Sequence, residues 1–198
     1  MTTTITDFIF PKIHTFPPLY TKQPNSTILS NQLDSWCQII LSYCEYYRIT
    51  SLTINGIPKY TQLETIDLEK IPPIFENKTI NRTTNDDFKS SIIHHLIYKL
   101  NKAEYINPKK PELGIYIYWR SLVEWGQLLY DYVDNSGQLG TVLTIYELTK
   151  SDENGLPDSL KNLDETLLIK IVKDFLIKQG KAQILMTEDN EIGGVKIV

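Results

Sequence analysis

The chain has 198 residues and a formal net charge of -4 at pH 7, with 41% hydrophobic and 22% charged residues. This composition is typical of a globular protein with a hydrophobic core, and the length fits one average domain or two small ones. The acidic total argues against a general nucleic-acid-binding protein, which normally carries a basic surface.

Sequence features also argue against a membrane or secreted protein. No apolar run approaches the roughly 20 residues of a transmembrane helix, and the first seven residues lack the basic start of a signal peptide. The two cysteines, Cys37 and Cys44, lie seven residues apart in one predicted helix, too far apart for a disulfide. We therefore expect a cytoplasmic protein with buried thiols.

The first predicted element is an N-terminal arm, residues 1–26. Its segment Phe16-Pro17-Pro18-Leu19-Tyr20 is rich in proline, which restricts both its own backbone and that of the preceding residue. We expect an extended, polyproline-like strand that presents Phe16 and Tyr20 to a groove of a partner. We then expect Pro18→Ala and Tyr20→Ala to weaken that contact and leave the fold intact. Two alternatives are that the arm packs on its own domain, or that it is a ligand for a WW domain.

The rest of the chain is an internal duplication. Residues 33–43 align with residues 122–132, and both segments carry Leu, Trp, Gln and Tyr at matching positions. Residues 99–103 align in the same order with residues 178–182. Tandem similarity of this kind predicts two related domains, which we assign to residues 27–121 and 122–198.

Hydrophobic spacing predicts the same order of elements in both domains. The first domain is expected to contain a helix over 29–47, a strand over 52–54, a second helix over 60–68, a polar stretch over 69–83, a third helix after Asn85, and a hairpin of 104–106 with 115–119. The second is expected to contain a helix from 122 to 132, a strand near 141–145, a short helix over 146–148, a helix after Asp164, and a hairpin of 183–186 with 195–198. Helix, strand, helix, helix, hairpin is the winged-helix order. The predicted fold class is therefore α+β, with two tandem winged-helix domains after an extended proline-aromatic arm.

No pattern in the chain predicts catalysis, a metal site or a cofactor. The sequence has no nucleophile elbow, phosphate-binding glycine loop or zinc-protease motif. The adjacent His94 and His95 point about 100° apart on a helix, so they cannot hold one ion together. Trp36 and Trp125 lie on apolar stripes and are expected in the cores. We predict a protein that is not an enzyme.

Charge is distributed unevenly between the two domains. Residues 1–121 carry 13 Lys and Arg and 11 Asp and Glu, a net charge of +2, whereas residues 122–198 carry 7 Lys, no Arg and 13 Asp and Glu, a net charge of -6. A winged helix that binds DNA presents basic residues to phosphates. The second domain is therefore expected to bind a basic protein partner, or to expose a solvated acidic face without a partner. Winged-helix nucleic-acid binding or a role in transcription is the alternative function.

Several motifs together resemble one known family, the small vacuolar protein-sorting subunits of the ESCRT-II complex. The similarity begins at Phe16–Asn25 and covers nearly the whole chain except residues 55–83. The motifs that carry it are Phe16-Pro17-Pro18-Leu19-Tyr20-Thr21-x-Gln23-Pro24-Asn25, Gln32-Leu33-x-x-Trp36, Tyr118-Trp119-Arg120, Trp125-Gly126-x-Leu128-Leu129-Tyr130, Ser136-Gly137-Gln138, Thr144-Ile145-Tyr146-Glu147-Leu148, Leu163-Asp164-Glu165-x-Leu167-Leu168 and Gly194-Val195-Lys196-Ile197-Val198.

The resemblance implies a non-catalytic subunit of two tandem winged helices, present in two copies on a core of two larger ESCRT-II subunits. It implies that Pro17, Pro18, Leu19 and Tyr20 dock in hydrophobic pockets of those subunits. It also implies that the second winged helix recruits the first ESCRT-III subunit through that subunit's N-terminal helix, for the sorting of ubiquitinated cargo into multivesicular bodies. Contact with the endosome membrane is expected through partners only, and no direct contact with nucleic acid is expected.

Overall fold

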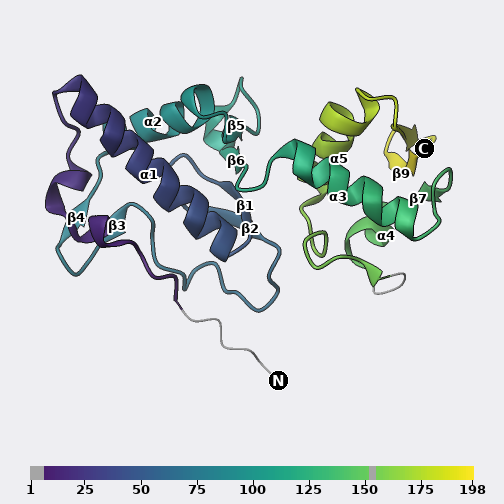
Figure 1. Cartoon of the computed structure of the whole chain (residues 1–198), viewed down its shortest axis with the longest axis horizontal. Coiled ribbons are helices and arrows are strands. Elements are labelled where there is room, and N and C mark those ends of the chain that lie inside the picture. Colours follow the sequence, from purple (N-terminus) through teal and green to yellow (C-terminus); the bar gives the residue numbers. More distant parts are fainter. Residues whose placement is uncertain (1–6, 152–154) are drawn as a thin grey trace. The chain divides into compact units, whose positions relative to one another are not determined.

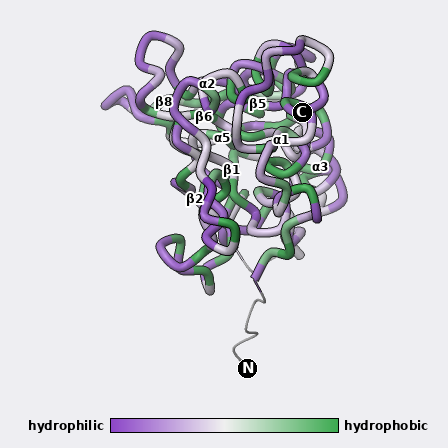
Figure 2. The backbone as a smooth tube through the Cα atoms, turned by 90° about the vertical axis from the view of Figure 1, so that its left-hand side faces the viewer, coloured by the Kyte–Doolittle hydropathy of each residue, from purple (hydrophilic) through white to green (hydrophobic). Residues whose placement is uncertain are grey.

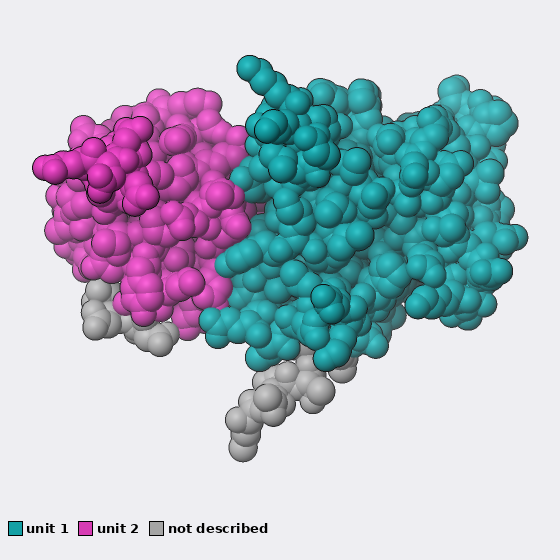
Figure 3. All heavy atoms as spheres, turned by 180° about the vertical axis from the view of Figure 1, so that it is seen from behind, with its two compact units in different colours: residues 1–119 teal, residues 120–198 magenta. Residues whose placement is uncertain are grey.

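The computed structural model describes residues 7–151 and 155–198, so the first six residues of the predicted arm lie outside the described residues. The chain divides into two compact units, Met1–Trp119 and Arg120–Val198 (Figure 3). Each unit has its own helices, sheet and hydrophobic core (Figure 1). The α+β fold class is confirmed. The arm falls within the first unit, and the finer domain limits at residues 27 and 122 stay predictions.

The first unit packs a long helix and a shorter one against a four-stranded sheet of order β2-β1-β6-β5. All neighbours in this sheet are antiparallel, and β1 pairs with β6 through Ser51 opposite Tyr116. Asn25 caps the long helix by accepting hydrogen bonds from the amides of Thr27 and Ile28. The elements are α1 (Ser26–Tyr46), β1 (Ile49–Leu52), β2 (Pro58–Thr61), β3 (Glu76–Asn77), β4 (Arg82–Thr83), α2 (Asp86–His94) continued by a π-helical turn (His95–Lys99), β5 (Ala103–Tyr105), a short 3-10 turn (Pro111–Leu113) and β6 (Ile115–Ile117).

The helix predicted over residues 60–68 is wrong. The segment forms strand β2, paired with β1, and then a series of turns. The cause is the Asn55-Gly56 turn, in which Gly56 adopts φ +78° and donates its amide to the carbonyl of Thr53. Asn-Gly is a strong hairpin signal, and this turn folds the chain back along β1 instead of starting a helix.

The second unit has the predicted order of helix, strand, helix, helix and hairpin. Its three-stranded sheet has the order β7-β9-β8. Capping boxes begin two of its helices, with Ser121 paired to Glu124 and Thr144 paired to Glu147. The elements are α3 (Leu122–Asn135), β7 (Val142–Leu143), α4 (Ile145–Thr149), α5 (Glu165–Ile171) continued by a π-helical turn (Val172–Ile177), β8 (Ala182–Met186) and β9 (Ile192–Ile197).

The two units share detailed backbone geometry at the end of the third helix. Both helices end in a π-helical turn, followed by a residue in the left-handed region, Asn101 at φ 53° and Gly180 at φ 71°. The amide of Lys102 then bonds to the carbonyl of Leu96, and that of Lys181 to the carbonyl of Leu176. These two hydrogen bonds span six and five residues and so are not equivalent, whereas the left-handed residues Asn101 and Gly180 occupy aligned positions, as the duplication predicts.

Each unit is built on a buried tryptophan. Trp36 is fully buried in the first unit, and Trp125 is 2% exposed in the second. Cys37 and Cys44 are free and buried, as predicted, and burial together with the nearby Asp34 raises the pKa of the Cys37 thiol to about 12. Hydrophobic and hydrophilic residues are interspersed along the chain (Figure 2). No helix among the described residues is long and apolar enough to cross a membrane.

Gly126 on α3 provides a test of the packing in the second unit. A Cβ atom at this position would collide with the ring of Phe175, whose Cε1 would be 2.7 Å away. Gly126→Ala should lower the free energy of unfolding of this unit by about 1–3 kcal/mol through overpacking. Amide hydrogen exchange in α3 and β9 measures this decrease in the free energy of unfolding. Asn135→Ala, at an exposed position of the same helix, should change the free energy of unfolding by less than about 0.5 kcal/mol. Equal destabilisation by the two variants would contradict the close packing of Gly126 against Phe175.

Candidate functional site

The arm is not an extended strand. It forms two consecutive 3-10 turns, Lys12–Thr15 and Pro17–Tyr20, separated by the extended residue Phe16. Pro17 starts the second turn, where its missing amide and fixed φ are favourable. The amide of Leu19 bonds to the carbonyl of Phe16, and that of Thr21 to the carbonyl of Pro18. The prolines therefore stiffen a compact turn, and the expected polyproline conformation is wrong here.

The turn Pro17–Tyr20 buries its last two residues in the first unit. Leu19 and Tyr20 are each 3% exposed, and the Tyr20 ring meets the Trp36 ring edge to face at a centroid distance of 5.3 Å. Burial raises the pKa of the Tyr20 phenol to about 12, and its hydroxyl donates to the carbonyl of His14 over 2.9 Å. In the free chain Leu19 and Tyr20 are part of this unit's own core, and their docking on a partner stays a prediction. The alternative that the arm packs on its own domain holds for these residues.

Two side chains of α1 hold the turn by its backbone carbonyls. The Gln32 side-chain Nε2 lies 2.9–3.0 Å from the carbonyl oxygens of Pro18, Leu19 and Thr21, so its two N–H groups are shared among the three carbonyls. The Trp36 indole N–H donates to the carbonyl of Leu19 over 2.9 Å. Gln32 and Trp36 are four residues apart and share one face of the helix. Because buried carbonyls need donors, this pair determines where the arm lies.

A buried histidine joins the arm to the segment that follows β2. His14 is 3% exposed and lies 3.2 Å from the carbonyl of Ile74 through Nε2. The Asn77 side-chain amide lies 3.3 Å from Nδ1 and donates to the His14 carbonyl over 2.9 Å. A carbonyl at Nε2 and an N–H donor at Nδ1 together match the neutral ring with its proton on Nε2. Burial lowers the pKa of His14, and the hydrogen bond to Ile74 offsets part of that shift.

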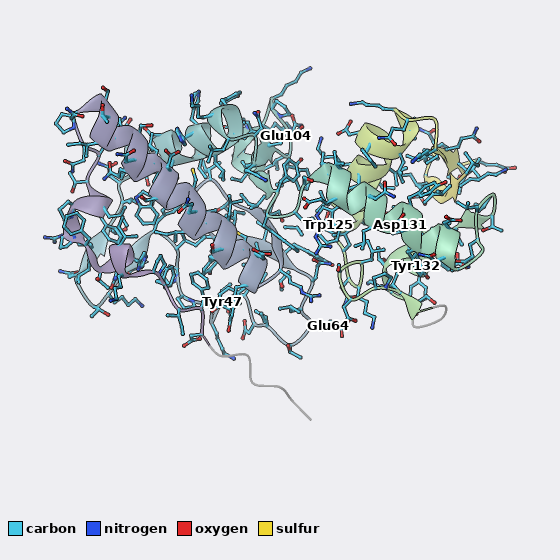
Figure 4. All side chains as sticks on the ribbon, in the orientation of Figure 1. Tyr47, Glu64, Glu104, Trp125, Asp131 and Tyr132 are labelled. Atoms are coloured by element: carbon cyan, nitrogen blue, oxygen red, sulfur yellow. The ribbon has the colours of Figure 1, made fainter. Side chains whose placement is uncertain are left out.

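Residues 55–83, which lie outside the aligned sequence motifs and which we call the insertion, also contact the arm. Strand β4 lies against the turn Pro17–Tyr20 (Figure 1). Ile74 and Phe75 are 1% and 4% exposed and belong to the same core as Trp36. Farther along α1, Phe8 donates its amide to the hydroxyl of Tyr47, which lies just past the end of the helix (Figure 4). The arm is thus clamped between α1 and the insertion.

What the clamped arm leaves exposed is an apolar groove of about 320 Å³, which we call the arm groove. Phe16 is 56% exposed, and Ile13 and Ile28 are 40% and 54% exposed. The groove is lined by Ile13, Phe16, Pro18, Leu19, Gln23, Ile28, Asn31, Gln32 and Ser35. It therefore brings together three of the predicted site residues, Phe16, Pro18 and Leu19. Pro17 is exposed outside the lining, and Tyr20 lies in the core.

Four residues with roles here were missed at the sequence level. Ile13 and Ile28 extend the apolar surface, and His14 and Gln32 position the arm. Gln32 had a visible signal, because it belongs to the motif Gln32-Leu33-x-x-Trp36 at helical spacing. Ile13, His14 and Ile28 had none, since their surroundings are set by contacts with distant parts of the chain.

The other histidines do not form a ligand site. His95 lies 2.7 Å from Asp34 on α1, whereas His94 contacts the ring of Tyr98. No cluster of three or more metal-ligating side chains occurs in residues 7–151 or 155–198.

The second unit exposes acidic side chains on one helix. Glu124, Asp131 and Asp134 are exposed on α3, with Asp131 labelled in Figure 4. Asp131 accepts a hydrogen bond from Gln127 over 2.6 Å. Spacings of seven and three residues place the carboxylates along one side of the helix. We call this set the α3 acidic face.

Burial of His14, which lowers its pKa, makes the stability of the first unit depend on pH. In the unfolded chain the ring is protonated below about pH 6.5, whereas the folded protein keeps it neutral to a lower pH. The stabilisation is therefore complete above pH 6.5 and is lost as the pH falls towards the folded pKa, by at most about 1.4 kcal/mol per pH unit. Urea unfolding at several pH values should show a shallower slope for His14→Gln than for the wild type. The exposed His94→Gln should keep the wild-type slope, and equal slopes for all three proteins would contradict this role.

Comparison with known proteins agrees with this architecture. Residues 13–164 match the family described as ESCRT-II complex subunit. The chain is similar to vacuolar protein-sorting-associated protein 25 of Rattus norvegicus, with 32% identity over 96% of this chain and 97% of the relative. It is also similar to the crystal structure of subunit VPS25 of the endosomal trafficking complex ESCRT-II, with a TM-score of 0.80 and 28% identity over 95% of this chain and 98% of that one.

A third similarity is to a chain in the crystal structure of the endosomal complex ESCRT-II (VPS22/VPS25/VPS36). Its TM-score is 0.77, with 27% identity over 96% of this chain and 98% of the matched chain. The family match, the relatives and the solved structures thus extend over both units, and the chain belongs to the ESCRT-II complex subunit family.

Proposed function

We propose that this chain docks on two larger ESCRT-II core subunits through the arm groove. The supporting observation is that Phe16, Ile13 and Ile28 are apolar and substantially exposed although the arm itself is firmly held. A preformed surface of this kind loses little conformational entropy on binding. The solved complex similar to this chain contains VPS22 and VPS36 beside VPS25, which is the kind of assembly expected here. The contact residues are Phe16 and Pro18 with Ile13 and Ile28, whereas Leu19 and Tyr20 support them from below.

The second part of the proposal assigns recruitment to the second unit. The α3 acidic face would bind the basic N-terminal helix of an ESCRT-III subunit, by electrostatic complementarity. Two copies per complex would place two such sites close together and raise the local ESCRT-III concentration. The complex would act at the endosome membrane in sorting ubiquitinated cargo into multivesicular bodies, with membrane contact made by its partners.

Charges in the third helix of the second unit favour this function over nucleic-acid binding. Asp174 lies 2.7 Å from Lys170 and 3.3 Å from Lys178. The hydrogen bond from Lys170 lowers the pKa of Asp174 more than its slight burial raises it. Two lysines of the helix that would enter a DNA groove are therefore paired with a carboxylate.

Substitution of Phe16 tests docking through the arm groove. Phe16→Ser should reduce co-purification with the two core subunits at least about tenfold, because an exposed aromatic anchor is lost. Its free energy of unfolding should stay within about 0.5 kcal/mol of the wild type. Tyr98→Ser, which removes an aromatic ring that is 62% exposed elsewhere in this unit, is the matched control and should bind normally.

Two outcomes separate docking from folding. Normal capture of Phe16→Ser would contradict docking through the arm groove. Tyr20→Ala should instead destabilise the first unit by about 3–5 kcal/mol through the cavity it leaves, so the expectation that this variant keeps its fold intact is withdrawn.

Charge reversal tests recruitment by the second unit. In the full chain, Asp131→Lys combined with Asp134→Lys should weaken binding of a fluorescent peptide copying the basic N-terminal helix of the ESCRT-III subunit. Wild-type binding should also weaken from low to high salt. The matched control reverses Glu188 and Asp189 at the β8–β9 turn and should bind normally. Binding lost only in that control would overturn the assignment to α3, and affinity independent of salt would contradict the charge argument.

A further inference from the structure

A second groove of the first unit is built by the insertion and takes no part in the proposed contacts. Its volume is about 520 Å³. Its walls come from the β1–β2 turn, from the segment that leads into β3, and from the first turn of α2. We call it the insertion groove. It shares no lining residue with the arm groove.

The floor of the insertion groove is apolar and fixed in place. It includes Tyr43, Ile74 and Phe75, which are all less than 5% exposed. Gly56 allows the turn to lie directly on the Phe75 ring, because a Cβ there would be 2.6 Å from Cε2. The Tyr43 hydroxyl donates to the carbonyl of Pro72 over 2.8 Å and holds the other wall. The floor therefore exists before any ligand binds.

An exposed apolar side chain stands at the rim of the groove. Ile57, in the β1–β2 turn, is 60% exposed although it lines the groove. Binding of an apolar group in the groove would remove this apolar surface from water, which is favourable. The groove thus offers a surface for an aliphatic or aromatic side chain.

The charged residues that line the groove are predominantly acidic. Glu69, Glu76 and Asp86 face one cation, Lys89, which pairs with Asp86 over 3.0 Å. Among the described residues, Glu69 and Glu76 have no ion-pair partner within 4 Å. Of the lysines nearest to them in the sequence, Lys70 pairs with Asp67, and Lys78 lies two residues after Glu76 without forming an ion pair to it within 4 Å. The rim therefore carries two exposed carboxylates that are not ion-paired among the described residues, around an apolar floor.

We propose that the insertion groove binds an extended segment of a partner protein in which an apolar side chain is flanked by Lys or Arg. The apolar side chain would rest on Phe75 and Ile57, and the basic residues would pair with Glu69 and Glu76. Charge complementarity selects the basic flanks, and the preformed floor supplies the apolar anchor. This gives the insertion a binding role separate from core docking and from ESCRT-III recruitment.

The test uses the full chain and a defined probe, the peptide acetyl-Gly-Lys-Lys-Leu-Lys-Lys-Gly-amide. Amide chemical-shift changes should be largest at residues 55–58 and 68–76. Glu76→Lys should weaken this binding at least about fivefold, through loss of an attractive pair and gain of a repulsive one. Ile57→Ser should weaken it as well, and since that side chain is exposed the fold should not change. Glu112→Lys, the same charge reversal at an exposed position outside the groove, should have no effect.

Two matched peptides decide between this site and non-specific charge attraction. Replacing the central Leu by Ser should abolish the shifts at the groove, as should replacing the four Lys by Glu. Equal binding of the Ser and Leu peptides would overturn the proposal, because it would show attraction by charge alone. Shifts confined to α3, or unchanged affinity in Glu76→Lys, would overturn it too.

Discussion

The hydrogen bonds from Gln32 and Trp36 to the carbonyls of the arm are the constraint on which the first unit depends. A turn that contains two prolines has few amides of its own, so its buried carbonyls must find donors in other elements. Gln32 and Trp36 supply three N–H donors from one face of α1, and these serve the carbonyls of Pro18, Leu19 and Thr21. The attached turn buries Leu19 and Tyr20, the Tyr20 hydroxyl donates to the carbonyl of His14, and strand β4 lies against the same turn.

The same attachment changes the physical basis expected for partner binding. An extended arm would become ordered on docking and would lose conformational entropy at that moment. Here the arm is already ordered, and Phe16, Ile13 and Ile28 are exposed on a rigid base. The proline-aromatic motif thus has two different roles along five residues, since its last two residues anchor the arm and its first residues form the surface.

Sequence reasoning predicted those elements that depend on local periodicity. The apolar stripes of α1 and α3, the capped third helices and both C-terminal hairpins could be predicted because each pattern is complete within its own segment. The prediction of a helix over residues 60–68 was wrong because the helical pattern there is weak. The Asn55-Gly56 turn and the pairing of β2 with β1 outweigh it. The extended conformation predicted for the arm was wrong because the arm is held by Gln32, Trp36 and Asn77, which are distant from it in the sequence. Apolar residues such as Ile28 could not be assigned to the candidate site for the same reason.

The most direct test of the account is amide hydrogen exchange of Leu19 and Thr21, measured in the free chain and in the complex with its two core subunits. Their amides bond to the carbonyls of Phe16 and Pro18 within the clamped turn. Both amides should already be protected in the free chain, and the complex should add protection only at the exposed residues of the arm groove. Rapid exchange of both amides in the free chain, with protection appearing only in the complex, would contradict this expectation.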